Sequence, residues 1–342
     1  MGKFVEHSKL KICERCILPE TFPGIKFDED GVCNHCKRAK SINAKASEKK
    51  EKYRQRFDKL IKDTINKAPV YDVIMAYSGG KDSTYTMKLL KERYALRILA
   101  FTFDNHFVSP LALDNIKKCA DILETDHIQF RLPWPAAHKI FSLTAKEDIF
   151  SAPTLLRASS VCTACIGFVK SIVLKTALEM SIPFVAFGWS PGQAPIQAAI
   201  MKNNPDLIFK AQRAQKKAFP SEIKKIINHY FLPENYFEKF KERFPYNIHP
   251  LAFFKYDEKQ IIKELYNIGW KEPTDTDTNS SNCLLNALAN QRHIERHGFH
   301  PYVWEIANMV RQDIISREEG INKIYSKQKE SIINFAQERL GL

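Results

Sequence analysis

The 342-residue sequence lacks features that mark whole classes of protein. No apolar run approaches the ~18 residues of a membrane span, and the opening stretch MGKFVEHSKLK has no apolar signal-peptide core. We therefore expect a cytoplasmic protein without membrane insertion. The Walker A spacing, Gly-x4-Gly-Lys-Ser/Thr, is also missing, which disfavours a motor or a GTPase.

Acidic residues are in deficit, because 39 Asp and Glu face 52 Lys and Arg, giving a net charge of +13. Such a balance favours a polyanionic partner through counterion release and electrostatic steering. A basic surface that only maintains solubility is the alternative. The hydrophobic fraction of 44% predicts a globular chain, and the length predicts about two domains.

Four of the eight cysteines form two C-x2-C pairs near the start of the chain. Cys13 and Cys16 are followed, after sixteen residues, by Cys33 and Cys36. Four thiolates at this spacing match a zinc ribbon with one tetrahedral ion. Four sulfur ligands leave no open coordination position, so we expect Zn²⁺ to have a structural role.

A glycine-rich turn lies at the centre of the strongest local pattern, YDVIMAYSGGKDSTYTMKLL, which begins at Tyr71. The apolar run before the turn is typical of a buried parallel strand, and the stretch after it has the apolar spacing of a helix. Backbone N–H groups at a helix start lack intrahelical acceptors. With two glycines, two hydroxyls and the Lys81 ammonium, they predict a cradle for phosphate oxygens.

The turn matches the SGGxDS signature and thus resembles the PP-loop, or N-type, ATP pyrophosphatases. The resemblance implies that ATP binds with its pyrophosphate in the loop, that AMP passes to an acceptor oxygen, and that a nucleophile then displaces AMP. It implies that Lys81 neutralises the leaving group and that Asp82 positions Mg²⁺. The expected ATP-binding residues are Ser78, Gly79, Gly80, Lys81, Asp82, Ser83, Phe103, Asp104 and Gly188.

Strand and helix patterns alternate after the loop, with strands expected at 97–103, 127–132, 182–188 and 249–254 and a helix at 111–123. This order predicts an α/β fold with a doubly wound parallel sheet, of the adenine nucleotide alpha hydrolase-like or HUP type. We expect a zinc ribbon at 1–40, a basic linker helix at 41–68, a PP-loop domain at 69–200, and a helical region at 201–342 that completes the site.

A second cysteine group consists of Cys162 and Cys165, at the start of an expected helix, and the distant Cys283. The positive end of that helix is expected to favour thiolate. The layout resembles the tRNA two-thiouridine synthetases. That resemblance implies that the three cysteines hold a 4Fe-4S cluster whose free iron carries the attacking sulfur. A second structural zinc with a further ligand, or inert buried thiols, are the alternatives.

Other stretches resemble the N-acetyl sugar amidotransferases of surface-polysaccharide biosynthesis. These are FDEDGVCNHCK in the ribbon, the Gly-Trp-Ser-Pro-Gly loop at 188–192, and the tail HIERHGFHPYVWEIANMVRQDIISREEGI with His300, Tyr302 and Arg311. The loop at 188–192 lacks the acidic residue of the thiolation branch. Such an enzyme takes ammonia from a glutaminase, and because Gly2 stands where a cysteine nucleophile would be needed, the glutaminase would be a partner.

Three functions therefore follow from the sequence. The first is adenylation of a tRNA base or a nucleotide-bound small molecule, with sulfur inserted from a sulfur donor, with Lys81, Asp82 and the three cysteines as catalytic residues. The second is amidation of an N-acetyl nucleotide-sugar with a glutaminase subunit. The third is a nucleic-acid-binding module that only senses ATP. A homodimer is compatible with each.

Overall fold

The computed structural model describes residues 10–43, 46–277, 280 and 282–342, so Gly2 lies outside the described residues. A six-stranded sheet forms the centre, in the order β3-β2-β1-β4-β6-β5. The strands are β1 Val73–Ala76, β2 Ile98–Asp104, β3 Asp126–Arg131, β4 Phe184–Phe187, β5 Ile200–Lys202 and β6 Tyr246–Ile248. All neighbouring strands are parallel except β5 and β6. The predicted doubly wound parallel sheet is confirmed.

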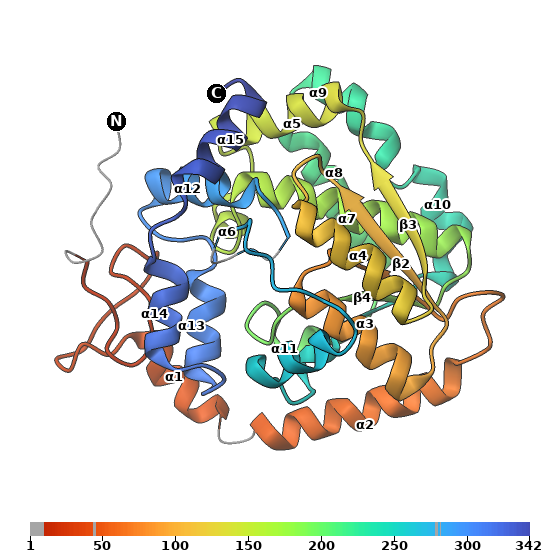
Figure 1. The fold of residues 1–342 in the computed structure, drawn as a ribbon, viewed down its shortest axis with the longest axis horizontal. Coiled ribbons are helices and arrows are strands. Elements are labelled where there is room, and N and C mark those ends of the chain that lie inside the picture. The colour runs from red at the N-terminus through yellow and green to blue at the C-terminus, as the bar shows by residue number, and fades with distance from the viewer. Residues whose placement is uncertain (1–9, 44–45, 278–279, 281) are drawn as a thin grey trace.

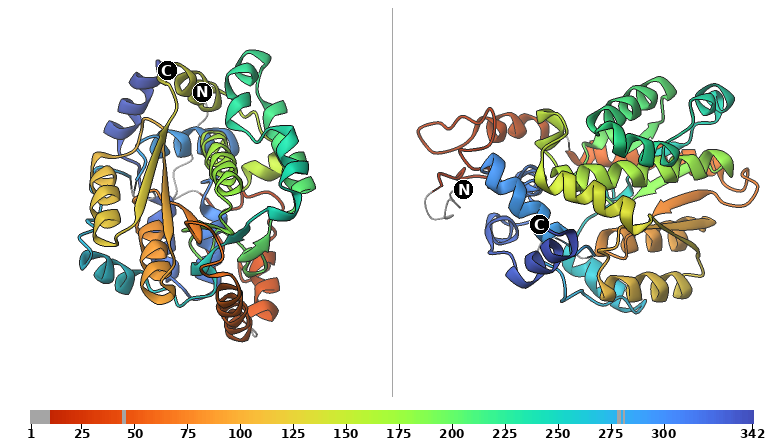
Figure 2. Two further views of the ribbon diagram at one scale, coloured as in Figure 1. Left: turned by 90° about the vertical axis from the view of Figure 1, so that its right-hand side faces the viewer. Right: turned by 90° about the horizontal axis from the view of Figure 1, so that it is seen from above.

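Helices cover both faces of the sheet (Figures 1 and 2). The α-helices are α1 Asn34–Asn43, α2 Ala46–Thr64, α3 Lys81–Tyr94, α4 Pro110–Ile122, α5 Trp134–Lys146, α6 Ala152–Leu155, α7 Ser160–Glu179, α8 Pro205–Ala218, α9 Ser221–Ile227, α10 Glu234–Lys239, α11 Glu258–Tyr266, α12 Asn286–His297, α13 Val303–Arg311, α14 Arg317–Tyr325 and α15 Glu330–Leu340. Short 3₁₀ turns occur at 196–198, 228–230, 241–243 and 250–252.

Side chains of each central strand alternate between two hydrophobic clusters. In β1, Val73 and Met75 join the cluster under α2, α3, α4 and α11, whereas Ile74 joins the cluster under α5, α7, α9, α12 and α15. The same alternation runs along β2 and β4. Because strand side chains point to opposite faces in turn, both faces of the sheet are buried.

The N-terminal ribbon packs against the end of the chain. Its four cysteines share one hydrophobic cluster with residues of α13 and α14, and Figure 1 shows these segments side by side. The domain boundaries stay a prediction. The sheet itself continues past residue 200, since β5 and β6 both follow that position.

Two expected elements differ in the structure. The strand predicted at 249–254 is wrong: the strand is β6, and Pro250–Ala252 forms a 3₁₀ turn. Leu251 and Phe253 are nevertheless buried. The apolar run therefore indicated correctly that this segment is buried, but it did not indicate a strand. The linker predicted as one helix contains α1 and α2, with residues 44–45 outside the described part.

Helix α7 is the one described helix that is long and apolar enough to cross a membrane by length and composition. Ten of its twenty residues are buried, including Phe168 and Val173 at the centre of the larger cluster. In this fold α7 is therefore a core helix. It lies in the connection from β3, on one side of β1, to β4, on the other side.

Candidate functional site

The glycine turn is held in a conformation that depends on glycine. Gly79 has φ +73°, and a Cβ there would lie 2.6 Å from the Ala112 carbonyl oxygen. The indole N–H of Trp270 donates to the Gly79 carbonyl at 2.9 Å. Gly80 is the N-cap of α3, and the hydroxyls of Ser78 and Ser83 lie 3.1 Å apart across the turn. The N–H groups of the first turn of α3 thus face the concave side of a rigid loop.

The loop lies where the sheet topology reverses. The chain goes from β1 to β2 on one side and reaches β4, on the other side of β1, through α7. Ligands of open α/β sheets bind at such a switch point, beyond the carboxyl ends of the strands. Gly188, which follows β4, permits close contact, because a Cβ there would lie 2.4 Å from Ser83 Cα. Gly188 therefore meets the loop as predicted.

Lys81 is surrounded by polar groups from the C-terminal half. Its ammonium lies 2.8 Å from Asp82 Oδ1, 2.5 Å from the Tyr256 hydroxyl and 3.7 Å from Glu258. Burial lowers the pKa of Lys81, but the Asp82 and Glu258 carboxylates outweigh burial and hold it above its usual value. Burial and the Asp82 charge raise the pKa of Tyr256, whose hydroxyl donates to Asp82 at 2.8 Å. The ammonium is thus charged and pre-oriented.

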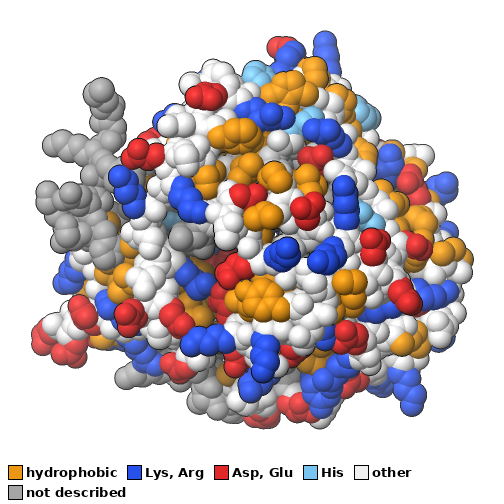
Figure 3. Space-filling model, in the orientation of Figure 1, with side chains coloured by type: hydrophobic (Ala, Val, Ile, Leu, Met, Phe, Trp, Pro, Cys, Tyr) orange, Lys and Arg blue, Asp and Glu red, His pale blue; other side chains and the backbone are white. Residues whose placement is uncertain are grey.

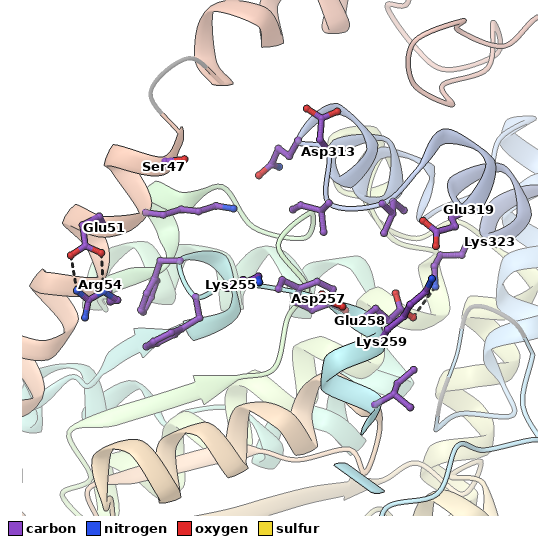
Figure 4. A pocket seen from close by; sticks show the side chains of 18 of the residues that line it. Ser47, Glu51, Arg54, Lys255, Asp257, Glu258, Lys259, Asp313, Glu319 and Lys323 are labelled. Carbon is purple, nitrogen blue, oxygen red and sulfur yellow. Dashed lines mark hydrogen bonds and ion pairs between the residues drawn. The ribbon is translucent and has the colours of Figure 1, made fainter. Parts of the chain in front are cut away.

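The partners of Lys81 also line a large cavity. It has about 1140 Å³ and lies between α2, α11 and the turn from α13 to α14. In Figure 4, Glu258 meets Lys323 across this space, at 3.0 Å, and Glu51 pairs with Arg54 on the opposite wall. Lys81 itself does not line this cavity, but Tyr256 and Glu258, which contact its ammonium, do.

The two predicted residues at the end of β2 are in different environments. Phe103 packs between Phe130 and Phe168 in the core. Asp104 is nearly buried, accepts from the His106 backbone N–H at 2.8 Å and pairs with Arg131 at 3.2 Å. Asp104 therefore orders the loop after β2. Contact of either residue with ATP stays a prediction.

The three distant cysteines converge beside this loop. Cys283 forms a β-bridge with Val108, just past β2, and this pairing brings its thiol to Asn105. The Asn105 amide donates to Cys283 Sγ at 3.4 Å and Cys165 Sγ at 3.8 Å. Cys162 Sγ lies 3.5 Å from the Tyr302 hydroxyl. Three thiols predicted as one group therefore gather at the N-terminal half of α7.

Their protonation differs from the expectation. Burial raises the pKa of Cys162 and of Cys165, and it raises that of Cys283 to about 11. The expected thiolate preference from the α7 dipole is therefore wrong, because burial disfavours the charged form more strongly. A bound cation that replaces the thiol protons is needed to keep all three sulfurs anionic.

Glu305 of α13 connects the two groups. It accepts a hydrogen bond from the Ser190 hydroxyl at 2.7 Å, and both Asp82 and Lys81 act on it electrostatically. Burial, together with the Asp82 charge, raises its pKa to about 7. One helical turn earlier, Tyr302 contacts Cys162. Glu305 therefore supplies, from the C-terminal region, a carboxylate at the loop where the sequence shows none.

A cavity of about 920 Å³ opens at Tyr302 and Glu305. Its other walls come from α6, α7, α8 and the loop after β4, including Lys170 and Trp189. The Lys170 ammonium lies 4.9 Å from the centre of the Trp189 ring. The cavity thus joins a titratable acid to aromatic and cationic walls, and residues next to Cys162 and Cys165 line it.

The N-terminal cysteines form the second candidate metal site. The sulfurs of Cys13 and Cys36 lie 3.8 Å apart, as do those of Cys16 and Cys33, and all four lie within 4.8 Å of one another. Within the described ranges, no other group of this kind is so compact. Arg311 donates to Cys16 Sγ at 3.3 Å. The four predicted thiols come together in a group that could hold a metal ion, and one residue of the tail contacts it. Binding of zinc there stays a prediction.

The sequence analysis missed Tyr256, Glu258, Glu305 and Asn105. It also missed Asn286, whose side-chain oxygen accepts a hydrogen bond from the Tyr302 hydroxyl at 2.8 Å. Tyr256 and Glu258 follow an apolar run, so they read as the start of a surface helix. Glu305 lies three residues after Tyr302. This helical spacing could have indicated that the two side chains lie on the same side of the chain. His300 is buried, and burial lowers its pKa to about 3, so it is a neutral packing residue.

Comparisons with known proteins give distant matches. No family model matches the chain. An uncharacterized protein of Methanocaldococcus jannaschii is 22% identical over 270 residues, which cover 79% of this chain and 78% of that protein.

Two solved structures are distantly similar. The U34-tRNA thiolase NcsA from Methanococcus maripaludis with its 4Fe-4S cluster has a TM-score of 0.35 and 16% identity, covering 85% of this chain and 80% of that chain. A predicted subunit of tRNA methyltransferase from Methanocaldococcus jannaschii has a TM-score of 0.31 and 18% identity, covering 68% and 91%. Likenesses of this size carry no functional conclusion.

Proposed function

We propose that this protein is an enzyme that adenylates an acceptor with ATP and then replaces the activated oxygen with sulfur. The acceptor is a base of tRNA or a nucleotide-bound small molecule. One observation carries the proposal: the charges of Lys81 and Asp82 act on Glu305 of α13, and Tyr302, the N-cap residue of α13, lies 3.5 Å from Cys162 Sγ. We infer from this that the glycine loop and the three thiols serve one reaction.

In the first step, the acceptor oxygen attacks the α-phosphorus of ATP and pyrophosphate leaves. The N–H groups at the start of α3, the hydroxyls of Ser78 and Ser83, and the Lys81 ammonium stabilise the charge that develops on pyrophosphate. Asp82 would hold Mg²⁺, which when bound would supply further positive charge to the phosphates. Tyr256 and Glu258 orient Lys81 for this task.

The three thiols suit an iron–sulfur cluster. The Asn105 amide donates to Cys165 and Cys283, Cys162 lies beside Tyr302, and all three thiols are partly buried. Burial raises the pKa of each thiol, so a bound cation would be needed to keep them anionic. Cys162, Cys165 and Cys283 would hold the cluster. When bound, a 4Fe-4S cluster with three protein ligands supplies one iron at which a sulfide can be held.

In the second step, a hydrosulfide attacks the carbon that carries AMP. A carbon–sulfur bond forms, the carbon–oxygen bond breaks, and AMP leaves with the oxygen. Glu305, with a pKa of about 7, accepts the sulfhydryl proton. Sulfur enters and remains at the sulfide oxidation level, so the step needs neither oxidant nor reductant. The source of sulfide is the partner that the reaction requires.

The N-terminal metal is proposed to be structural zinc. A tetrahedron with metal–sulfur bonds of ~2.3 Å has edges of about 3.8 Å. The two thiol pairs across the site have this separation. The ion would stabilise the ribbon where it packs against α13, which carries Glu305, and α14.

Anaerobic purification followed by iron, sulfide and zinc analysis tests this function. We expect one zinc and a 4Fe-4S cluster per chain. Cys283→Ser should lose the iron and its visible absorbance and keep the zinc, while Cys119→Ala, a buried cysteine in the cluster under α4, should keep both. Two zinc ions per chain, with activity retained in Cys283→Ser, would contradict sulfur insertion and favour amidation with ammonia from a glutaminase.

A further inference from the structure

We propose that the 920 Å³ cavity accepts one unpaired nucleotide of an RNA strand and that the neighbouring face of α8 and α9 binds the phosphates of that strand. The identity of the acceptor rests on the proposed function. Binding of the strand does not, so the two can be tested apart.

The walls of the cavity suit a nucleotide. Its volume of about 920 Å³ lies at the upper end of small-molecule pockets. Phe150, Trp189 and Trp304 supply aromatic surface, and Arg157 and Lys170 supply positive charge. Aromatic surface with nearby cations is the combination that holds single-stranded bases and their phosphates.

The reactive end of the cavity lies where the chemistry is proposed. Tyr302 and Glu305 form that end, and Tyr302 reaches Cys162. Glu305 is the one acidic side chain among the lining residues. An anionic ligand therefore meets a single carboxylate, placed at the point where a proton has to be removed.

A basic surface continues from the cavity mouth along α8 and α9. Residues 205–227 carry six cations, Lys210, Arg213, Lys216, Lys217, Lys224 and Lys225, and two acids, Asp206 and Glu222. Glu222 is already paired with Lys139. No ion pair is recorded for Arg213, Lys217 or Lys224 within the described ranges. On the face shown in Figure 3, by contrast, cations and anions are interspersed.

Continuity between the two features favours a strand over a free nucleotide. Ala214 and Lys217 line both the 920 Å³ cavity and a hollow of about 430 Å³ that also contains Arg213 and Lys224. A polyanion that fills the cavity with one nucleotide continues directly over these cations. A nucleotide-sugar has no further phosphates to place there. A duplex does not present a free base, so base pairing should block entry.

Fluorescence anisotropy with a labelled 12-nucleotide single-stranded RNA of mixed sequence, without ATP, tests this inference. Arg213→Glu/Lys217→Glu/Lys224→Glu is compared with Lys52→Glu/Arg56→Glu/Lys59→Glu on α2, which changes the net charge equally at exposed positions. Losing three phosphate contacts should make the slope of log K against log salt shallower by about 2 and should weaken binding at least about tenfold. The α2 variant should bind almost like the wild type.

Ala211→Trp tests the cavity separately, because Ala211 is an exposed position of α8 that lines the cavity and does not line the 430 Å³ hollow. It should weaken single-stranded RNA binding and leave the unfolding temperature unchanged. Equal affinity for the annealed duplex, or equal losses in both charge variants, would overturn the inference. RNA binding that follows these expectations without pyrophosphate release would leave the inference standing and contradict the proposed function.

Discussion

Replacing Glu305 with glutamine gives the sharpest physical test of the site, because one side chain links the loop and the thiols. The substitution keeps the shape and an acceptor for the Ser190 hydroxyl and removes the titration. We expect the variant to be less active and, above neutral pH, more stable than the wild type. A site residue held in an unfavourable charged state commonly shows this opposition of stability and activity.

The magnitude follows from the pKa. Burial and Asp82 raise the pKa of Glu305 to about 7 from the model-peptide value of 4.5. The folded state therefore holds its proton more tightly than the unfolded state, and stability falls as pH rises from below 4.5 to above 7. Linkage gives a penalty of about 0.8 kcal/mol at pH 5 and about 3.3 kcal/mol at pH 8. The stability advantage of Glu305→Gln should thus grow by about 2.5 kcal/mol over this interval.

Denaturant unfolding of both proteins at pH 5 and pH 8 measures this difference, and constant terms such as the altered Ser190 hydrogen bond cancel. The wild-type rate of AMP formation should rise with pH through an apparent pKa near 7, and this limb should be missing in Glu305→Gln. A stability difference that does not change with pH would refute the buried-carboxylate reasoning. An unchanged pH–rate profile would refute the proton-acceptor role.

Three further predictions concern the loop and the metal. Lys81→Ala should lower pyrophosphate release by roughly 10²–10³-fold, a result checked by a coupled pyrophosphate assay; Lys88→Ala, on the same helix, is its control. Gly188→Ala places a Cβ 2.4 Å from Ser83 Cα and should destabilise the fold by about 1–3 kcal/mol and weaken ATP binding, measured by calorimetry. Cys36→Ser should release the N-terminal ion and lower the melting temperature, whereas an unchanged zinc content would contradict a four-thiol site.

Local patterns were enough to predict the sheet and the metal site. The apolar runs of β1, β2 and β4 can be recognised in the sequence, because parallel strands are buried on both faces. The glycine turn after β1 can be recognised in the same way from its residues alone. The C-x2-C pairs also carry their ligand geometry in their spacing. At the start of α14, Ser316 and Glu319 form a capping box, another feature that depends on local spacing alone.

Residues that reach the site from far along the chain were not predicted. Tyr256 and Glu258 meet Lys81 from a segment more than 170 positions away, and Glu305 does so from beyond residue 300. Such contacts depend on how α11 and α13 dock on the sheet. The protonation of the α7 thiols was wrong for a related reason: a helix start is visible in sequence, whereas the burial that opposes its dipole is not.

The most direct test of the account follows the acceptor oxygen. Anaerobic protein with its cluster is incubated with ATP, sulfide and unmodified tRNA transcribed with ¹⁸O at the pyrimidine carbonyls, and the AMP and RNA are analysed by mass spectrometry. The account predicts one ¹⁸O in AMP for each sulfur gained by the RNA. AMP without ¹⁸O, or formation of ADP in its place, would contradict it.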